Sequence, residues 1–288
     1  MRYREMLHPY GFARRRGLSD SDYVTLVRDL DDAVAAVDGH GFRLTPFGFA
    51  PDLDARLALE PATTLVKDET DNVSGSHKGR HLFGLALQIT LAGRFGALDR
   101  WPPRLAIASC GNAALAAAVV ARAARWPLSV FVPPTANEFV LGRLDALGAE
   151  VVECPRVPGD PPGDPCVRRF RAAVAAGALP FSCQGPENGL TVDGGRTLAY
   201  EIVDGLRAAQ LGAGAAAPIP AVDAPGGAAL GRDVCLYVQV GGGAMAAGLA
   251  AGFEDAAALG CLGRTPDCPG SSPCRPRVRR RWPGRIAG

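Results

Sequence analysis

The sequence predicts an α/β protein built on a parallel sheet, and three observations point to it. Apolar runs of strand length alternate with helical stretches through the middle of the chain. Small-residue turns join several of these runs to the helix that follows. Of the 288 residues 48% are apolar and 21% are charged, which is ordinary for a globular chain with one large core or two modest ones. Disorder is therefore excluded as a description of the whole chain.

The first expected element is a helix near the N-terminus. Ser19 or Ser21 is suited to cap it, and Gly39 follows its last apolar residue. Its apolar residues recur at intervals of three and four: Tyr23, Leu26, Leu30, Val34 and Val37. We expect residues 1–41 to form a helical extension that packs on the main body.

Strands and helices then alternate, as in parallel sheets with crossover helices. The predicted strands are 63–66, 105–108, 128–132, 149–153, 179–182 and 234–240. The predicted helices are 78–92, which Gly93 should stop, 112–125, 137–147, 167–176 and one that includes 194–202. Two stretches rich in glycine, proline or alanine, 155–165 and 212–231, are expected to be surface loops.

Lys78 is the most informative single residue. The sequence has only two lysines, Lys67 and Lys78, and the second lies in Ser-Gly-Ser-His-Lys-Gly-Arg (74–80), directly ahead of a helical stretch. A helix start disfavours the ammonium form and makes the neutral, nucleophilic amine easier to reach. Such an amine can form a Schiff base with an aldehyde, whereas the alternative is a solvated first-turn lysine.

Two turns are suited to bind anions. Ser-Cys-Gly-Asn-Ala (109–113) and Gly-Gly-Gly-Ala-Met (241–245) each follow a predicted strand and precede a helix, so they present backbone N–H groups at a helix N-terminus. The three glycines also let a phosphate approach without meeting a Cβ. Gly241, Gly243 and Ala246 satisfy a dinucleotide-binding pattern as well. That alternative expects the motif in the first βαβ unit, and here several units precede it.

Four segments in the same order resemble the fold-type II pyridoxal-phosphate enzymes, which include threonine synthase, threonine and serine dehydratases, cysteine synthase and the tryptophan synthase β chain. The segments are 67–80, 109–112, 194–202 and 241–245. The resemblance covers roughly residues 42–258 and implies a tryptophan synthase β-like core. In that fold two parallel-sheet lobes hold the cofactor between them, with the smaller lobe here near 85–190. The C-terminal part of this fold is expected to be incomplete.

The resemblance also implies roles for individual residues. Pyridoxal 5′-phosphate would be bound to Lys78 as a Schiff base, and Asn112 would hydrogen-bond its 3′-oxygen. The phosphate would lie against Gly241, Gly242, Gly243, Ala244 and Met245. The substrate carboxylate would be received by Ser109, Cys110, Gly111 and Ala113. Ser76 and Arg80 would support the lysine. Cys110 stands where many relatives have serine, which leaves the identity of the substrate open.

The activity that the resemblance implies is α,β-elimination, an ammonia-lyase or dehydratase reaction, on a hydroxy amino acid such as serine or threonine. Two alternatives remain open. One is a replacement reaction like that of threonine synthase or cysteine synthase, and the other is a catalytically impaired remnant that still binds the cofactor. Relatives are often dimers, so a homodimer is expected.

Residues 259–288 are expected to be an irregular basic tail. From position 261 onward the chain has seven arginines and one aspartate, a net charge of +6, whereas the other 260 residues have 24 basic and 28 acidic side chains, or −4. Such a segment could bind nucleic acid. It has no aromatic interleaving beyond Trp282, so an aberrant end such as a shifted reading frame is the preferred hypothesis.

The remaining features indicate the cellular setting. The eight cysteines are scattered without C-x-x-C spacing, so neither a zinc site nor an oxidising compartment is indicated. Residues 1–16 lack the apolar region of a signal peptide. The uncharged run 234–253 divides into a strand, a turn and a helix better than it fits a membrane span. We therefore predict a cytoplasmic protein with an amino acid substrate, no metal, no membrane contact and no nucleic acid partner.

Overall fold

A computed structural model describes residues 2–211 and 235–261; the side chains of residues 209–211 are excepted. In chain order the helical elements are η1 (Arg4–Met6), α1 (His8–Arg15), α2 (Asp20–Asp38), α3 (Pro51–Arg56), η2 (Val73–Gly75), α4 (Lys78–Arg94), α5 (Asn112–Ala124), α6 (Glu138–Ala146), α7 (Pro165–Ala175), α8 (Thr191–Leu211) and α9 (Ala244–Ala258). The strands are β1 (Phe47–Phe49), β2 (Leu65–Lys67), β3 (Leu105–Ala108), β4 (Leu128–Val132), β5 (Glu150–Glu153) and β6 (Leu179–Pro180).

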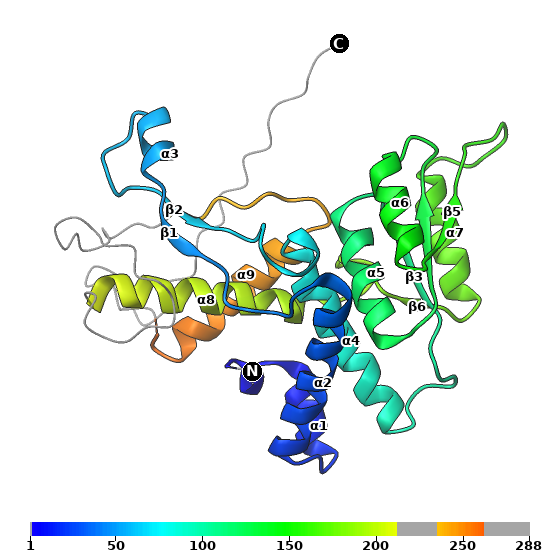
Figure 1. Ribbon diagram of the computed structural model, residues 1–288, viewed down its shortest axis with the longest axis horizontal. Helices are drawn as coiled ribbons and strands as arrows, with labels where there is room; N and C mark the ends of the chain where they lie inside the picture. Colours follow the sequence, from blue (N-terminus) through cyan, green and yellow to red (C-terminus); the bar gives the residue numbers. More distant parts are fainter. Residues whose placement is uncertain (1, 212–234, 262–288) are drawn as a thin grey trace.

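Four of the strands form one parallel sheet in the order β5-β4-β3-β6. Its central pair aligns Leu105 with Leu128, and both runs are buried because helices cover the two faces. Figure 1 shows α5 and α6 on one side of this sheet and α7 on the other. The predicted α/β class is thereby confirmed.

The other end of the molecule is built differently (Figure 1). It contains α8 with α9 packed along it and a two-stranded antiparallel pair in which Phe47 faces Lys67. Within residues 2–211 and 235–261 this end has no parallel sheet, although the resemblance implied a second one. The residues that the structure describes therefore show only part of a second lobe.

The predicted strand 234–240 is wrong for the residues that the structure describes. Residues 235–240 have no regular secondary structure, and the Tyr237 side chain is 93% exposed. A strand is stabilised by pairing with a neighbour, and none of the strands in the described ranges pairs with this segment. Val234 and the predicted loop 212–231 lie outside the described residues.

The helix predicted near the N-terminus is α2 in the structure. Ser19 caps α2 by accepting from the Asp22 N–H at 3.0 Å, and Gly39 ends it with a φ of 91°. Tyr23 and Val27 pack into a cluster that includes Leu91, so α2 packs against α4. The short helix α1, which the sequence reading did not identify, packs against α4 as well.

Several boundaries differ from prediction. Gly93 does not stop α4, which continues to Arg94. The Trp101 ring fills the space where a side chain at position 93 would lie, so packing accounts for the glycine at this position. β2 lies about two residues later than predicted, and β6 ends at Pro180. The helix predicted to include 194–202 is α8, which begins at Thr191 and is longer. Residues 154–164 form the predicted loop before α7.

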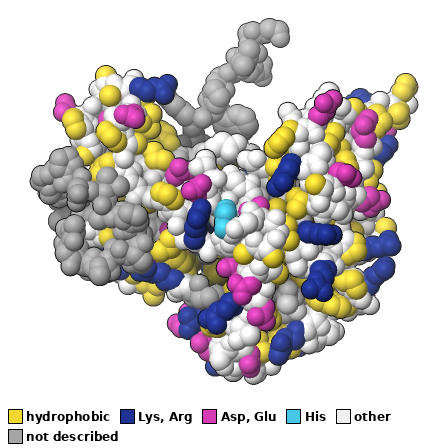
Figure 2. Space-filling view, in the orientation of Figure 1, with side chains coloured by type: hydrophobic (Ala, Val, Ile, Leu, Met, Phe, Trp, Pro, Cys, Tyr) yellow, Lys and Arg dark blue, Asp and Glu magenta, His cyan; other side chains and the backbone are white. Residues whose placement is uncertain are grey.

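No helix in the described ranges is long and apolar enough to cross a bilayer. The same residues contain no group of three or more His, Cys, Asp or Glu side chains placed to hold a metal ion. On the face shown in Figure 2, basic and acidic side chains are interspersed.

Candidate active site

Lys78 is the first residue of α4, and a tight turn holds it there. Asn72 begins this turn, and its Oδ1 accepts from the Val73 N–H at 2.8 Å. Gly75 has a φ of 70°, a conformation that glycine adopts without strain. The Lys78 N–H donates to Ser76 Oγ at 3.4 Å. Lys78 as a whole is half-buried.

Lys67, the other lysine of the sequence, is held in a buried ion cluster. Its side chain is 7% exposed, and its Nζ donates to Glu201 Oε2 at 2.6 Å and to the Thr45 carbonyl oxygen at 2.5 Å. Burial lowers the pKa of Lys67, and the Glu201 carboxylate opposes that shift. The Lys67 amine is therefore bonded and covered. Of the two lysines, this leaves Lys78 as the candidate for reaction with an aldehyde.

Two histidines flank Lys78 in the sequence and in space. Burial lowers the pKa of His77 to about 4, and the positive charge of Lys78 adds to this effect. His81, which bonds the Thr191 carbonyl oxygen through Nδ1 at 2.7 Å, also has its pKa lowered by burial to about 4. Both imidazoles are therefore neutral near pH 7, and neither adds positive charge beside the lysine.

The turn at 109–113 lies where β3 ends, at the carboxyl edge of the parallel sheet. The Ser109 N–H donates to the Phe131 carbonyl oxygen at 3.2 Å, which extends the ladder with β4 by one bond. Gly111 then caps α5, and its carbonyl oxygen accepts from Ala114 and Leu115. The first N–H groups of α5 have no acceptor within the helix, so they are free to bind an anion.

The residues of this turn differ in their exposure. Cys110 and Asn112 are exposed, and Gly111 has open space where a Cβ would stand. The same helix, α5, packs against α4 and against η2, which precedes Lys78. The helix that follows the predicted carboxylate turn therefore packs on the helix that begins with the lysine.

The glycine turn is joined to the lysine through two residues that follow β6. Gly243 forms an isolated antiparallel bridge with Gln184. The neighbouring Cys183 directs its Sγ to the Lys78 carbonyl oxygen at 3.9 Å. The backbones of Lys78 and Gly243 therefore both contact the segment Cys183–Gln184.

The residues at this turn fit a phosphate group. Gly243 has a φ of 79° and caps the 15-residue helix α9. A methyl group at Gly241 would meet nothing nearer than Gln239 Nε2 at 4.0 Å, so the approach to the turn is open. At Gly242 a methyl group would lie 3.0 Å from Gln184 Cγ, which shows how closely that residue supports the turn. Ala244 is buried, whereas Gly241 and Gly242 are exposed.

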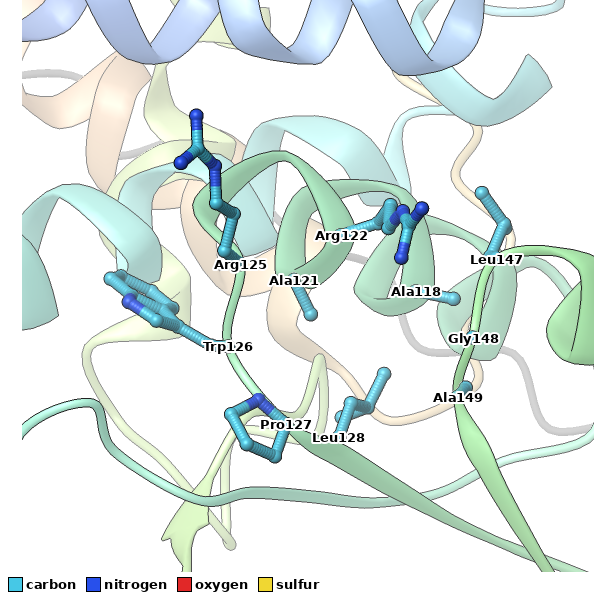
Figure 3. A pocket seen from close by; sticks show the side chains of 10 residues that line it. All are labelled: Ala118, Ala121, Arg122, Arg125, Trp126, Pro127, Leu128, Leu147, Gly148 and Ala149. Carbon is cyan, nitrogen blue, oxygen red and sulfur yellow. The ribbon is translucent and has the colours of Figure 1, made fainter.

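A cavity of about 500 Å³ lies elsewhere, at the amino ends of β4 and β5 (Figure 3). It is lined by Ala118, Ala121, Arg122, Arg125, Trp126, Pro127, Leu128, Leu147, Gly148 and Ala149. None of the predicted site residues is among them. The turn at 109–113 follows the carboxyl end of β3, so it lies at the opposite edge of the sheet from this cavity.

Sequence reasoning missed the residues that connect the turns. Cys183 and Gln184 carried no motif, and the partners of Arg80 could not be found from spacing. The Arg80 side chain is 6% exposed and bonds Glu69 and Glu201, and its role as support for the lysine stays a prediction. A buried arginine needs acidic partners, but the burial of Arg80 is visible only in the structure, so the sequence held no signal for Glu69 and Glu201.

A parallel α/β sheet, a lysine at a helix start and a glycine turn that fits a phosphate are the features of the fold-type II pyridoxal-phosphate enzymes. The sequence model of the family described as "Pyridoxal-phosphate dependent enzyme" matches residues 40–285. The chain therefore belongs to this family, whose cofactor is pyridoxal phosphate.

Solved structures with a related fold include the processed form of threonine deaminase isoform 2 from Solanum lycopersicum. That protein is 18% identical, the match covers 84% of this chain and 55% of the other, and the TM-score is 0.53. Maize serine racemase is 16% identical over 64% of this chain and 51% of the other, with a TM-score of 0.46. The diaminopropionate ammonia lyase of Escherichia coli is 21% identical over 66% and 53%, with a TM-score of 0.46.

The chain spans about half the length of these solved structures. No curated protein matches it.

Proposed function

We propose that this protein catalyses a pyridoxal-phosphate-dependent α,β-elimination on a hydroxy amino acid such as serine or threonine, with Lys78 as the residue that carries the cofactor. The observation that carries the proposal is the position of Lys78. It is the reachable one of two lysines, it begins a helix, and the segment Cys183–Gln184 connects it to a turn that fits a phosphate. The fold-level likeness to a threonine deaminase agrees with the elimination reaction.

In this proposal the phosphate is held by Gly241, Gly242, Gly243, Ala244 and Met245. When bound, the cofactor supplies an electron sink for the charge that develops at the substrate Cα. Asn112, exposed at the start of α5, is assigned to the 3′-oxygen of the ring.

The protein's own residues perform the remaining tasks. Ser109, Cys110, Gly111 and Ala113 bind the substrate carboxylate, mainly through backbone N–H groups at the start of α5. Once the amino group of the substrate has replaced it on the cofactor, the freed Lys78 amine would remove the Cα proton as general base. Loss of the β-hydroxyl as water and hydrolysis of the resulting product then give a 2-oxo acid and ammonia.

A second candidate is a protein that binds the cofactor without turnover. The exposure of Gly241 and Gly242 favours this alternative, because water at a site weakens its electrostatic stabilisation of a transition state. A replacement reaction would need a site for a second substrate. We also propose a homodimer and a cytoplasmic location, which size-exclusion chromatography with light scattering and cell fractionation would test.

The decisive experiment begins with the purified protein and pyridoxal phosphate. We expect a visible absorbance band, and after borohydride reduction a mass increase on the peptide that contains Lys78. Lys78→Ala should abolish both, whereas the control Lys67→Arg, which keeps the buried charge, should still be labelled at position 78. Oxo acid from serine or threonine then indicates elimination, and labelling without product indicates the binding protein. A protein that stays unlabelled contradicts both.

A further inference from the structure

We infer that Glu201 is a positioning residue, which acts by fixing α8 between the helix that begins with Lys78 and the helix that begins after the glycine turn. This inference rests on the proposed function, since it concerns how the same site is held together. Lys78 and Gly243 lie at the starts of α4 and α9, and both helices pack on α8. Figure 1 shows α8 extending from the left edge to the middle of the molecule, with α9 beside it and α4 crossing near its inner end.

The tie between α4 and α8 is a pair of buried charges. Arg80 Nη1 donates to Glu201 Oε1 at 2.6 Å, and Nη2 donates to Oε2 at 2.9 Å. The Glu201 side chain is 5% exposed, and it accepts from Lys67 as well. Arg80 follows Lys78 by two residues. The carboxylate on α8 therefore holds the first turn of α4, where the lysine is.

The backbones of α4 and α8 are also in direct contact. A methyl group at Gly194 would clash with the Arg80 carbonyl oxygen and lie 3.1 Å from His81 Cα. At Gly195 it would lie 2.5 Å from His81 Cε1. Backbone atoms of two helices cannot give way as a flexible side chain can, so a shift of α8 is passed on to α4.

The backbones of α8 and α9 are in direct contact as well. A methyl group at Gly248 would lie 2.9 Å from the Val192 carbonyl oxygen and 2.9 Å from the Gly195 carbonyl carbon. Further along, Tyr200 donates to Asp255 at 2.6 Å. Gly248 is in the second turn of the helix that Gly243 caps. The position of the glycine turn is therefore set by α8 too.

The position of α8 therefore affects the binding of a rigid ligand that is held at two points. Pyridoxal phosphate has an aldehyde for the lysine and a phosphate for the glycine turn at a fixed separation. The separation that the protein offers is determined by α8, through Glu201 on one side and Gly248 on the other. When the groups of a well-matched site are misplaced by about 1 Å, the reaction rate can fall about 100-fold.

The experiment compares pyridoxal phosphate with pyridoxal, which has the aldehyde and lacks the phosphate. Both are titrated into the full-length protein, and borohydride trapping at Lys78 measures binding. Glu201→Gln should lower the preference for the phosphate form about tenfold or more while trapping of pyridoxal at Lys78 persists. The control is Glu150→Gln. Glu150 lies on the exposed strand β5 and its carboxylate bonds Ser129, so its removal should leave the preference unchanged.

A second variant covers the case in which Glu201→Gln does not fold. Gly248→Ala acts on the contact between α8 and α9 without removing a charge, and it should lower the same preference. Its matched control is Gly142→Ala in α6, where a methyl group would meet nothing within 4 Å. A folded Glu201→Gln or Gly248→Ala protein that keeps the wild-type preference overturns the inference alone. A wild-type protein that traps neither aldehyde overturns the proposed function and this inference with it.

Discussion

Arg80 and Glu201 form a two-point ion pair in the interior of the protein, 121 residues apart in the sequence, with N–O distances of 2.6 and 2.9 Å. Glu69 accepts from Arg80 Nε at 2.7 Å, and Lys67 donates to Glu201 at 2.6 Å. The cluster therefore balances two positive with two negative charges, and the Thr45 hydroxyl bonds both sides of it. These hydrogen bonds raise the pKa of Arg80 although burial opposes the shift.

We predict that Glu201→Gln destabilises the protein by about 3 to 5 kcal/mol, because it leaves Arg80 and Lys67 buried with a single carboxylate. Urea unfolding followed by circular dichroism measures this. The double variant Arg80→Met/Glu201→Leu should cost less than the sum of the single variants, since it removes the unpaired charge together with its partner. Glu150→Gln on the exposed strand should stay within about 0.5 kcal/mol of wild type. A similarly small effect of Glu201→Gln would contradict the importance of the pair.

Protonation of His81 should destabilise the fold in mild acid. Burial lowers its pKa from 6.5 in the unfolded chain to about 4, so between these values the unfolded state binds more protons than the folded state. Stability is therefore full above pH 6.5 and is lost as the pH falls towards 4, by about 3 kcal/mol for this one group.

The variant His81→Gln isolates this effect, because an amide can still donate to the Thr191 carbonyl oxygen and does not titrate. Its stability relative to wild type should rise by about 3 kcal/mol between pH 7 and pH 4, measured as free energies of unfolding in urea. Groups common to both proteins cancel in the difference. A constant difference across this range would show that the imidazole is not buried as described.

Local signals account for the part of the fold that the sequence predicted. Ser19 and Gly39 mark both ends of α2, and Asn137 caps α6, because capping depends on neighbouring residues only. The turn 109–113 and the start of α4 at Lys78 were also located, since each is a short pattern of small or charged residues.

What the sequence could not provide depends on distant partners. The bridge from Gln184 to Gly243 and the pair of Arg80 with Glu201 join segments more than 50 residues apart. The wrongly predicted strand 234–240 also shows the dependence on a distant partner. Its residues favour a strand, but a strand also needs a neighbour, and that neighbour is not encoded in the segment.

Thiol labelling should separate the cysteines by exposure. Cys110 is exposed at the predicted carboxylate turn, whereas Cys183 is buried, and burial raises its pKa to about 12. We expect iodoacetamide at pH 8 to modify Cys110 in the native protein and to leave Cys183 unmodified until urea is added. Peptide mass spectrometry measures both. Cofactor with serine should slow the labelling of Cys110 but not that of the exposed Cys235, and equal slowing of the two would argue against a substrate at the turn.

Alanine substitutions at Gly243 and Gly260 separate the effect of backbone strain from the effect on phosphate binding. Gly243 has a φ of 79° at the start of α9, and Gly260 has a φ of 69° just beyond its end, with open space around both. Alanine at either position must adopt a left-handed conformation, which costs about 1 to 2 kcal/mol. Gly243→Ala and Gly260→Ala should therefore lose similar stability in urea.

Only Gly243→Ala should weaken the binding of pyridoxal phosphate, because the added Cβ stands where the phosphate is proposed to approach, while position 260 is at the opposite end of the helix. Fluorescence or absorbance titration measures the dissociation constants of the two variants. We expect a loss of about tenfold or more at position 243, as for the removal of a well-placed group that binds a charged ligand, and less than about twofold at position 260. Equal losses would mean that helix stability controls binding, and no loss at either position would remove the glycine turn from the site.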